Sequence, residues 1–458
     1  MRREQSKTVV VEEMLVINPN AAGLDIGSEE IWACVAANRD AQPVRKFGTY
    51  TPDLHSLADW LQACGVETVA MESTGVYWIP IYEILEARGF QVCLVNAHHL
   101  KHVPGRKSDW QDCQWIQRLH SFGLLNGSFR PQGEMCALRA YRRHRASLIE
   151  HRAAHIQHMH KALQQMNVQL AQALSDITGV TGLAILRAVV AGERDPLTLA
   201  QLRDPRCAKP ESELVKALTG NYRAEHVFAL KQALALYDTY SQQIRECDRE
   251  IERQYTALKP VHQDPLPPLD TSDKRNTHSK NAPEYDARSI LYQLLGVDLV
   301  AIPGLNASTV EDIISEVGTD MNGWASVKHF CSWLRLAPHN DISGGKVLRS
   351  HTLKGYNRAG QAFRLAAQAV SRTQTALGAY YRRMRAKHGP QKAIVATAHK
   401  LARIFYTMLK HRTPFHDIGA EEYDKRERQR QIAQMHKKAA KLGFTLVPAS
   451  AQPVQVSE

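Results

Sequence analysis

Strand and helix signals alternate between about residues 20 and 130, and this alternation constrains the fold more than any other feature of the sequence. AAGLDIG and EIWACVAA are typical of the two strands of a hairpin. The segments that follow are an amphipathic SLADWLQACG, a buried-strand pattern ETVAMES, a helical VYWIPIYEILEARG and a second apolar strand FQVCLVN. Such alternation predicts an α/β layer fold, which we assign to residues 17–130.

The next region, residues 131–258, carries helical patterns with few strand signals. Near its end, apolar or aromatic residues recur every seven positions, at Leu230, Tyr237, Ile244 and Ile251. The intermediate positions of the same seam are Ala233, Tyr240 and Cys247. A seam of this period predicts a coiled coil or an antiparallel helix pair. Dimerisation through it and packing within one chain both remain open.

Three further regions follow. Residues 259–288 are rich in Pro, Asp, Ser, Thr and Asn and predict a flexible linker. Residues 289–416 form a third, mainly helical unit, and residues 417–458 begin with a charged helix and end in a Pro-containing tail. The fold class is therefore α/β plus all-α.

Positive charge is concentrated in one part of the chain. The sequence has 58 Lys and Arg against 46 Asp and Glu, a formal charge of +12. From Ile342 to His416 there are fifteen Lys and Arg and no acid, so the remainder holds 43 basic against 46 acidic residues. The excess charge predicts a polyanionic partner for this segment.

Other protein classes do not fit the sequence. No apolar run is long enough for a membrane span, which predicts a protein without a membrane partner. Glu12 and Glu13 interrupt the first apolar stretch, so the N-terminus makes a poor signal peptide. The eight cysteines are scattered without a CxxC pair. They predict reduced thiols in a cytoplasmic protein.

Four acidic residues occur where an α/β fold gathers metal ligands. Asp25 and Glu72 end predicted strands, and Asp109 and Asp112 are three apart at the start of a predicted helix, hence on one face. Carboxylates gathered in this way suit Mg²⁺, and a pair of ions can clamp the oxygens of a phosphoryl transfer. The alternative is structural: turn residues after strands, and acids at a helix N-terminus.

Three segments, GLDIG, ESTGVYWIPIYEIL and LVNAHHLKHVPGRKSDWQDCQWIQRL, resemble the DEDD-type insertion-sequence transposases, now described as bridge-RNA-guided recombinases. The resemblance extends through the third unit. It implies an N-terminal RNase H/RuvC-like domain in which Asp25, Glu72, Asp109 and Asp112 bind Mg²⁺, central coiled-coil helices, and a C-terminal transposase domain. The sequence departs from the family pattern at Ser28, Ala97 and Cys113, none of which removes an acid.

The third unit opens with LLGVDLVAIPGLNASTVEDIISEVG, which predicts two short helices around a Pro-Gly turn. Ser308 or Thr309 is the candidate cap of the second helix. The pattern resembles a helix-hairpin-helix, whose backbone N–H groups grip phosphate. A plain structural connector is the alternative.

Ser343 precedes Gly344 and Gly345 within the basic segment. A serine hydroxyl there could attack a DNA phosphorus and store the bond as a phosphoserine ester, although the residues alone favour a plain polar turn. The resemblance implies that Ser343 is the nucleophile. We expect the neighbouring cations to contact nucleic acid; they are Lys346, Arg349, Lys354, Arg358, Arg364, Arg382 and Arg383.

The leading hypothesis is a DNA transposase that cuts and rejoins donor and target strands. The resemblance implies a structured guide RNA; we also expect a homo-oligomer, a dimer or tetramer, that associates with the nucleoid when acting. The alternatives are a RuvC-like nuclease using water, an actin-like ATPase suggested by GLDIGSEE, and a non-catalytic scaffold.

Two groups of histidines allow more than one interpretation. His151, His155 and His158 share one helical face, where RNA contact or helix packing is favoured over zinc. His98, His99 and His102 are interpreted as loop residues near phosphate.

Overall fold

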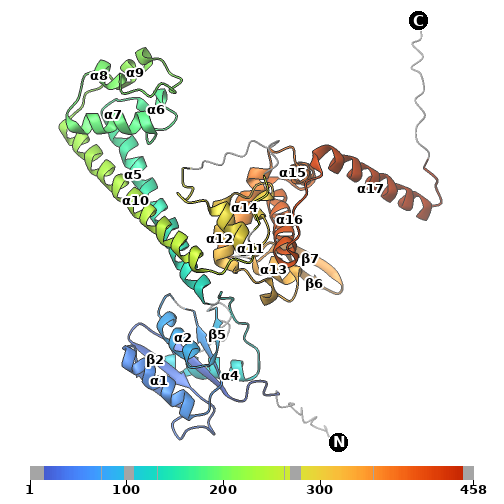
Figure 1. Cartoon of the computed structure of the whole chain (residues 1–458). Helices are drawn as coiled ribbons and strands as arrows, with labels where there is room; N and C mark the ends of the chain where they lie inside the picture. Colours follow the sequence, from blue (N-terminus) through green and yellow to red (C-terminus); the bar gives the residue numbers. More distant parts are fainter. Residues whose placement is uncertain are drawn as a thin grey trace, which may run out of the picture. The chain divides into compact units, whose positions relative to one another are not determined.

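The computed structural model describes residues 15–73, 75–96, 108–131, 133–262, 264–268, 280–353 and 355–446. Contacts between backbone positions divide the chain into two compact units, residues 1–130 and 131–458. The first unit mixes strands and helices, and the second is mostly helical (Figure 1). The predicted combination of an α/β region with an all-α region is therefore confirmed.

A five-stranded sheet forms the centre of the first unit. Its strands lie in the order β3-β2-β1-β4-β5. They are β1 (Ala21–Ile26), β2 (Glu30–Cys34), β3 (Val44–Gly48), β4 (Thr68–Glu72) and β5 (Gln91–Val95). The predicted hairpin is the antiparallel pair β1–β2, while β4 runs parallel to both β1 and β5. The sequence analysis did not identify β3, whose VRKFG has little apolar character.

Helices cover both faces of this sheet. α1 (Thr51–Ala63) and α2 (Trp78–Ala87) bury Leu57 and Leu85 in one cluster with Leu24 and Met71 of the strands. α4 (Asp109–Ser121) packs on the opposite face, where its Ile116 meets Ala70 and Val95. Because neighbouring strand residues point to opposite faces, residues 23 and 25 of β1 and residues 70 and 72 of β4 face α4.

Two long helices form an arm in the second unit (Figure 1). α5 (Glu134–Gln165) and α10 (Ala224–Ala257) pack along each other. They run antiparallel, since Arg145 pairs with Asp248 whereas His155 stacks on Tyr240. Their far ends are joined through α6 (Leu170–Ala173), α7 (Val180–Ala191), α8 (Pro196–Ala200) and α9 (Glu211–Leu218). The heptad seam of α10 thus packs within the chain, one of the two arrangements left open.

The remaining helices of the second unit form its body. They are α11 (Ala287–Leu295), α12 (Ala307–Val317), α13 (Val327–Trp333), α14 (Arg358–Val370), α15 (Ala376–His388), α16 (Pro390–His411) and α17 (Gly419–Lys441), with short 3-10 turns at Leu299–Ala301 and Met321–Gly323. Two strands, β6 (Pro338–Ser343) and β7 (Lys346–Thr352), make a hairpin in this mainly helical body. The fully buried rings of Phe330, Phe363 and Phe405 lie in its core.

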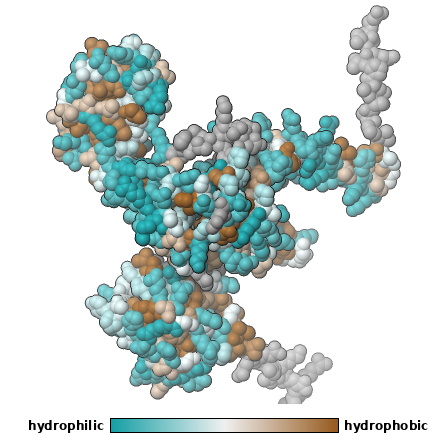
Figure 2. All heavy atoms as spheres, viewed as in Figure 1, coloured by the Kyte–Doolittle hydropathy of each residue, from teal (hydrophilic) through white to brown (hydrophobic). Residues whose placement is uncertain are grey.

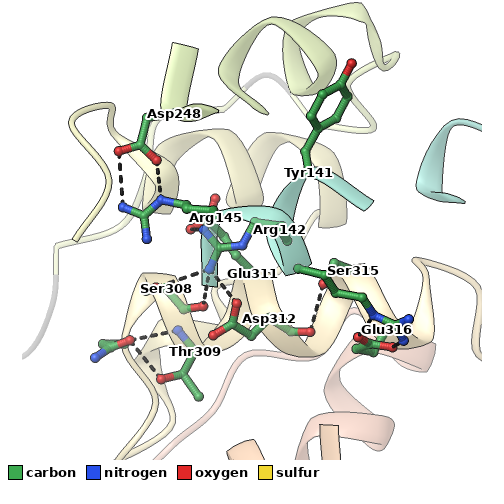
Figure 3. A network of polar contacts seen from close by, with 12 residues as sticks. Tyr141, Arg142, Arg145, Asp248, Ser308, Thr309, Glu311, Asp312, Ser315 and Glu316 are labelled. Carbon is green, nitrogen blue, oxygen red and sulfur yellow. Dashed lines mark hydrogen bonds and ion pairs between the residues drawn. The ribbon is translucent and has the colours of Figure 1, made fainter. Parts of the chain in front are cut away.

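A network of arginines and acids joins the arm to the body (Figure 3). Arg142 of α5 contacts Glu311 and Asp312 of α12. Arg145, on the next turn of α5, pairs with Asp248 of α10, and both side chains are only 3% exposed. Buried charges are tolerated when they are paired, so this network fixes how α5, α10 and α12 pack together.

The Pro-Gly turn between α11 and α12 is packed inside the body. Ile302, Pro303 and Leu305 are buried, and a side chain on Gly304 would collide with Val370 and the carbonyl of Ala366. This packing favours the structural connector over an open phosphate-gripping turn.

The predicted cap of α12 was wrong. The side chain of Asn306, and not that of Ser308 or Thr309, accepts a hydrogen bond from the backbone N–H of Thr309. The amide side chain of Asn306 is already at the N-cap position, where it reaches the third residue of the helix.

Two expectations about chemical class can be compared with the structure. In the described part of the chain, no helix combines the length and apolarity that crossing a membrane requires. All eight cysteines are free thiols, as expected, and Cys34, Cys64, Cys113, Cys247 and Cys331 are buried.

Candidate functional site

Asp25 lies on β1 with its side chain on the face covered by α4. The parallel register pairs Leu24 with Met71, so the next positions, Asp25 and Glu72, lie beside each other where the two strands end. Both side chains are half-buried. The carboxyl ends of parallel strands are where α/β sheets bind their ligands.

Helix α4 brings two more acids to this edge. Asp109 and Asp112 lie in its first turn, after Ser108 at the N-cap position. The helix packs tightly because Gly23, two residues before Asp25, has no side chain. A Cβ atom at that position would lie 2.3 Å from the backbone nitrogen of Gln117 and 2.5 Å from the carbonyl oxygen of Cys113.

Sequence reasoning did not identify Gly23 as part of the site. The signal was present, because an isolated glycine inside a strand pattern often marks a close approach of another backbone. Here the approaching backbone belongs to the helix that carries Asp109 and Asp112.

The pKa of Asp25 is affected by the three other acids, which lie near it. The pKa of the Asp25 carboxyl is raised from 3.8 to about 6, chiefly by burial and then by the charges of Asp109, Asp112 and Glu72, in that order. A hydrogen bond from the backbone N–H of Ile26 acts in the opposite direction. The structure therefore brings these four predicted residues into one negatively charged cluster.

Such a cluster suits a hard divalent cation, because carboxylate oxygens are its preferred ligands and its charge relieves their repulsion. In the described part of the chain, no three His, Cys, Asp or Glu side chains are already close enough to hold one ion together. The donor set fits a divalent cation chemically.

Ser343 lies in the second unit, at the tip of the β6–β7 hairpin. Gly344 and Gly345 form the turn with φ values of +56° and +78°, which glycine adopts without steric cost. Ser343 pairs with Lys346 across the turn, and almost every residue of both strands is exposed. Among the described residues, no side chain makes a hydrogen bond to the Ser343 hydroxyl.

The predicted nucleic-acid contacts fall into two groups. Lys346, Arg349 and Arg358 are exposed, the first two on the hairpin and the third at the start of α14. Arg364 and Arg382 have partners within the protein, since they donate hydrogen bonds to the carbonyl oxygens of Arg335 and Thr373.

Two predicted contacts remain. Arg383 forms an ion pair with Glu427, so its guanidinium already has an anionic partner. Lys354 lies outside the described residues, as do His98, His99 and His102.

The histidine stripe of α5 packs against an aromatic ring of α10. The rings of His151 and His155 both stack on Tyr240, with centroids 5.6 and 5.4 Å apart. His158 meets His155 edge to face. This arrangement agrees with helix packing, one of the two interpretations favoured over zinc.

Comparison with known families assigns the chain to a class. The family model for DEDD transposases of IS110, described as "Transposase", matches residues 22–168, which include all four clustered acids. A second model, "Transposase IS116/IS110/IS902 family", matches residues 298–382, which include Ser343. No curated protein matches the chain.

The fold and the two matches define a DNA transposase, an enzyme that recombines DNA strands. More particularly, the chain belongs to the IS110-type transposases of insertion sequences.

Proposed function

We propose that this transposase cleaves and rejoins the donor and target strands of an insertion sequence at a Mg²⁺ site formed by Asp25, Glu72, Asp109 and Asp112. The placement of Asp25 and Glu72 at neighbouring strand ends, on the face covered by the helix that carries Asp109 and Asp112, carries this proposal. Carboxylates of like charge are gathered at a cost in free energy, which a bound cation offsets. A divalent ion there would polarise the phosphoryl group and stabilise the charge that develops on its oxygens.

We further propose that the first unit is an RNase H/RuvC-like domain. The support is the mixed sheet with an antiparallel β1–β2–β3 edge, with acids at the ends of β1 and β4 and on an adjacent helix. The acids come from three different elements, β1, β4 and α4, so the cluster depends on the whole unit being folded.

Ser343 is the proposed nucleophile. Its Oγ attacks the DNA phosphorus, a phosphoserine ester forms as the bond to the leaving deoxyribose oxygen breaks, and the hydroxyl proton passes to solvent or to a base brought by the assembled complex. Because one phosphoester bond replaces another, the reverse attack rejoins a strand without ATP. The exposed Lys346 and Arg349 beside Ser343 would bind the phosphate.

The complete site is proposed to form in an assembly. Ser343 and the acids belong to different units of the chain, and a dimer or tetramer would let the serine of one protomer meet the acids of another. By the family resemblance, a structured guide RNA pairs with donor and target DNA, and the basic residues of the second unit contact phosphates.

The nucleophile can be tested with a nicked DNA substrate that traps a covalent intermediate. The wild-type protein should yield a protein–DNA adduct on a denaturing gel in Mg²⁺, and Ser343→Ala should yield none. Ser350→Ala is the matched control, because Ser350 lies on β7 of the same exposed hairpin. An adduct that persists in Ser343→Ala would refute the assignment of Ser343.

Hydrolysis by water at the acid cluster is the second candidate function. The exposed position of Ser343, at the tip of a hairpin and open to solvent, favours it. This function predicts that Ser343→Ala cuts DNA at the wild-type rate whereas Asp25→Asn does not.

Guide-RNA use is tested separately by sequencing RNA that copurifies with the protein. A discrete species matching DNA beside the gene supports guidance, and random fragments contradict it.

A further inference from the structure

The C-terminal helix α17 has two halves with different surroundings. Its first half is fixed to the body: Tyr423 is 7% exposed, and Glu427 forms an ion pair with Arg383 of α15. The ring of Tyr423 meets Tyr380 of α15 edge to face, and the ammonium of Lys400 lies 5.1 Å from it.

The start of the helix is tied down as well. The Asp417 carboxylate, just before α17, accepts a hydrogen bond from the backbone N–H of Ala376 at the start of α15. The backbone N–H of Ala420 donates to the carbonyl of Gln374. The first half of α17 is therefore an anchored part of the body.

The second half extends beyond this anchor (Figure 1). From Arg428 to Leu446 every residue except Ala439 is exposed. The acids of the helix are confined to its first half, since no Asp or Glu occurs between Glu427 and Glu458. The exposed half carries five cations, Arg428, Arg430, Lys437, Lys438 and Lys441.

Three of these cations continue the anchored face of the helix. Arg430, Lys437 and Lys441 follow Tyr423 at intervals of seven, seven and four residues, which places them on the same helical face. We call these three residues the cationic stripe. Beyond the anchor, the face that packs on α15 at Tyr423 becomes a row of positive charge.

The stripe has almost no charge partner within the protein. Arg430 lies 3.9 Å from Glu427 and its side chain is 72% exposed. Among the described residues, no carboxylate lies within ion-pair distance of Lys437 or Lys441. Lys441 also complements the helix dipole from the last turn, but this effect does not account for Arg430, which lies eleven residues earlier.

The opposite face carries exposed apolar residues, so the cations are not a uniform solvated surface. Ile432, Met435 and Leu442 are 44%, 53% and 66% exposed. Hydrophilic and hydrophobic residues lie next to each other along this helix (Figure 2). The three cations of the stripe thus share one face, whereas Arg428 lies among the apolar residues of the other.

We propose that the cationic stripe of α17 binds the phosphate backbone of duplex DNA and so adds a second DNA contact to the body. Charge complementarity selects the partner. The stripe is a row of exposed cations about 16 Å long, from the rise of 1.5 Å per residue, and DNA is the polyanion that this enzyme class recombines. The proposal rests on DNA as substrate and is independent of the roles of Ser343 and the metal.

The test measures binding of the full-length protein to an arbitrary DNA duplex at several salt concentrations. In the triple variant Arg430→Gln/Lys437→Gln/Lys441→Gln, affinity should fall roughly tenfold, and the slope of log affinity against log salt should decrease by about two to three, near one unit per lost phosphate contact. The variant Lys437→Arg/Lys441→Arg keeps the charge and should bind as the wild type does.

The matched control is Arg187→Gln/Arg206→Gln/Lys209→Gln. It removes three exposed cations from the segment that joins the far ends of α5 and α10. It has the same net charge as the stripe variant and should retain the wild-type slope. Circular dichroism and Tm should show that both proteins are folded. Three results would overturn the proposal. They are an unchanged salt slope in the stripe variant, an equal loss of DNA affinity in the control, and a loss of affinity seen only with an RNA duplex of the same length. The test measures binding and not cleavage, which separates its outcome from that of the nucleophile test.

Discussion

Arg142 of α5 and Glu311 of α12 form an ion pair 3.1 Å long whose side chains are 4% and 0% exposed. They are separated by 169 positions in sequence. Arg142 also donates to the carbonyl oxygen and the hydroxyl of Ser308. The arm and the body of the second unit therefore meet through a buried charge on each side.

Removing one partner of this pair should be strongly destabilising. We expect Arg142→Ala to lower the free energy of unfolding by about 3–5 kcal/mol, because Glu311 is left buried without its cation. Arg187→Ala, which breaks an exposed ion pair with Asp238, should cost at most about 1 kcal/mol. Urea unfolding followed by circular dichroism measures both. Equal costs for the two variants would contradict the structural role of the pair.

A side chain at Gly23 should separate α4 from the sheet. Because a Cβ there would lie 2.3 Å from the backbone of Gln117, Gly23→Ala should destabilise the protein by about 1–3 kcal/mol and abolish DNA cleavage by displacing Asp109 and Asp112. Gly127→Ala is the control, since its Cβ would meet only the Cys93 sulfur, at 3.4 Å. Tm and cleavage assays report the two effects. A fully active Gly23→Ala protein would show that the acids do not depend on this packing.

Asp25 should make stability depend on pH in the metal-free protein. Its folded-state pKa of about 6 lies above the ordinary 3.8, so the folded state holds the proton more tightly than the unfolded chain does. Stability contributed by the protonated carboxyl is present below about pH 4 and is lost as pH rises through 6. Asp25→Asn should therefore raise the Tm in EDTA at pH 8. After allowance for solvent screening, the corresponding gain in the free energy of unfolding is about 1 kcal/mol.

The same pair of proteins tests metal binding. At pH 4 the Tm values of wild type and Asp25→Asn should converge. Adding Mg²⁺ at pH 8 should raise the Tm of the wild type more than that of the variant, because binding to the folded state alone stabilises it. An equal response of both proteins to Mg²⁺ would remove Asp25 from the set of ligands.

The turn of the β6–β7 hairpin should matter for activity more than for stability. Gly344→Ala/Gly345→Ala introduces no collision, since nothing lies within 4 Å of either new Cβ, but both positions have positive φ. We expect about 1 kcal/mol of local strain per residue, an almost unchanged Tm because the hairpin is exposed, and a large loss of DNA cleavage.

Gly389→Ala is the matched control for the hairpin. Gly389 has φ +83° and open space around it, but it lies between α15 and α16. This variant should lower Tm slightly and retain cleavage. If both variants lost activity to the same extent, backbone strain in general and not the position of Ser343 would be responsible.

Much of the architecture followed from local patterns. The β1–β2 hairpin, the parallel strands β4 and β5 and the helices around them were predicted, because apolar periodicity distinguishes strands from helices. The short and weakly apolar β3 was not predicted. The two strands of the β6–β7 hairpin were also missed, because their exposed residues leave no buried face to produce an alternating pattern.

The sequence by itself determined which acids end strands or begin helices, where positive charge is concentrated and, through family motifs, which class of enzyme this is. Only the tertiary structure decided that Asp25, Glu72, Asp109 and Asp112 share one electrostatic cluster, and that the seam of α10 packs on α5 of the same chain. The reason is physical: periodicity is a local property, whereas the approach of α4 to Gly23 and the pairing of Arg142 with Glu311 depend on packing between residues far apart in sequence.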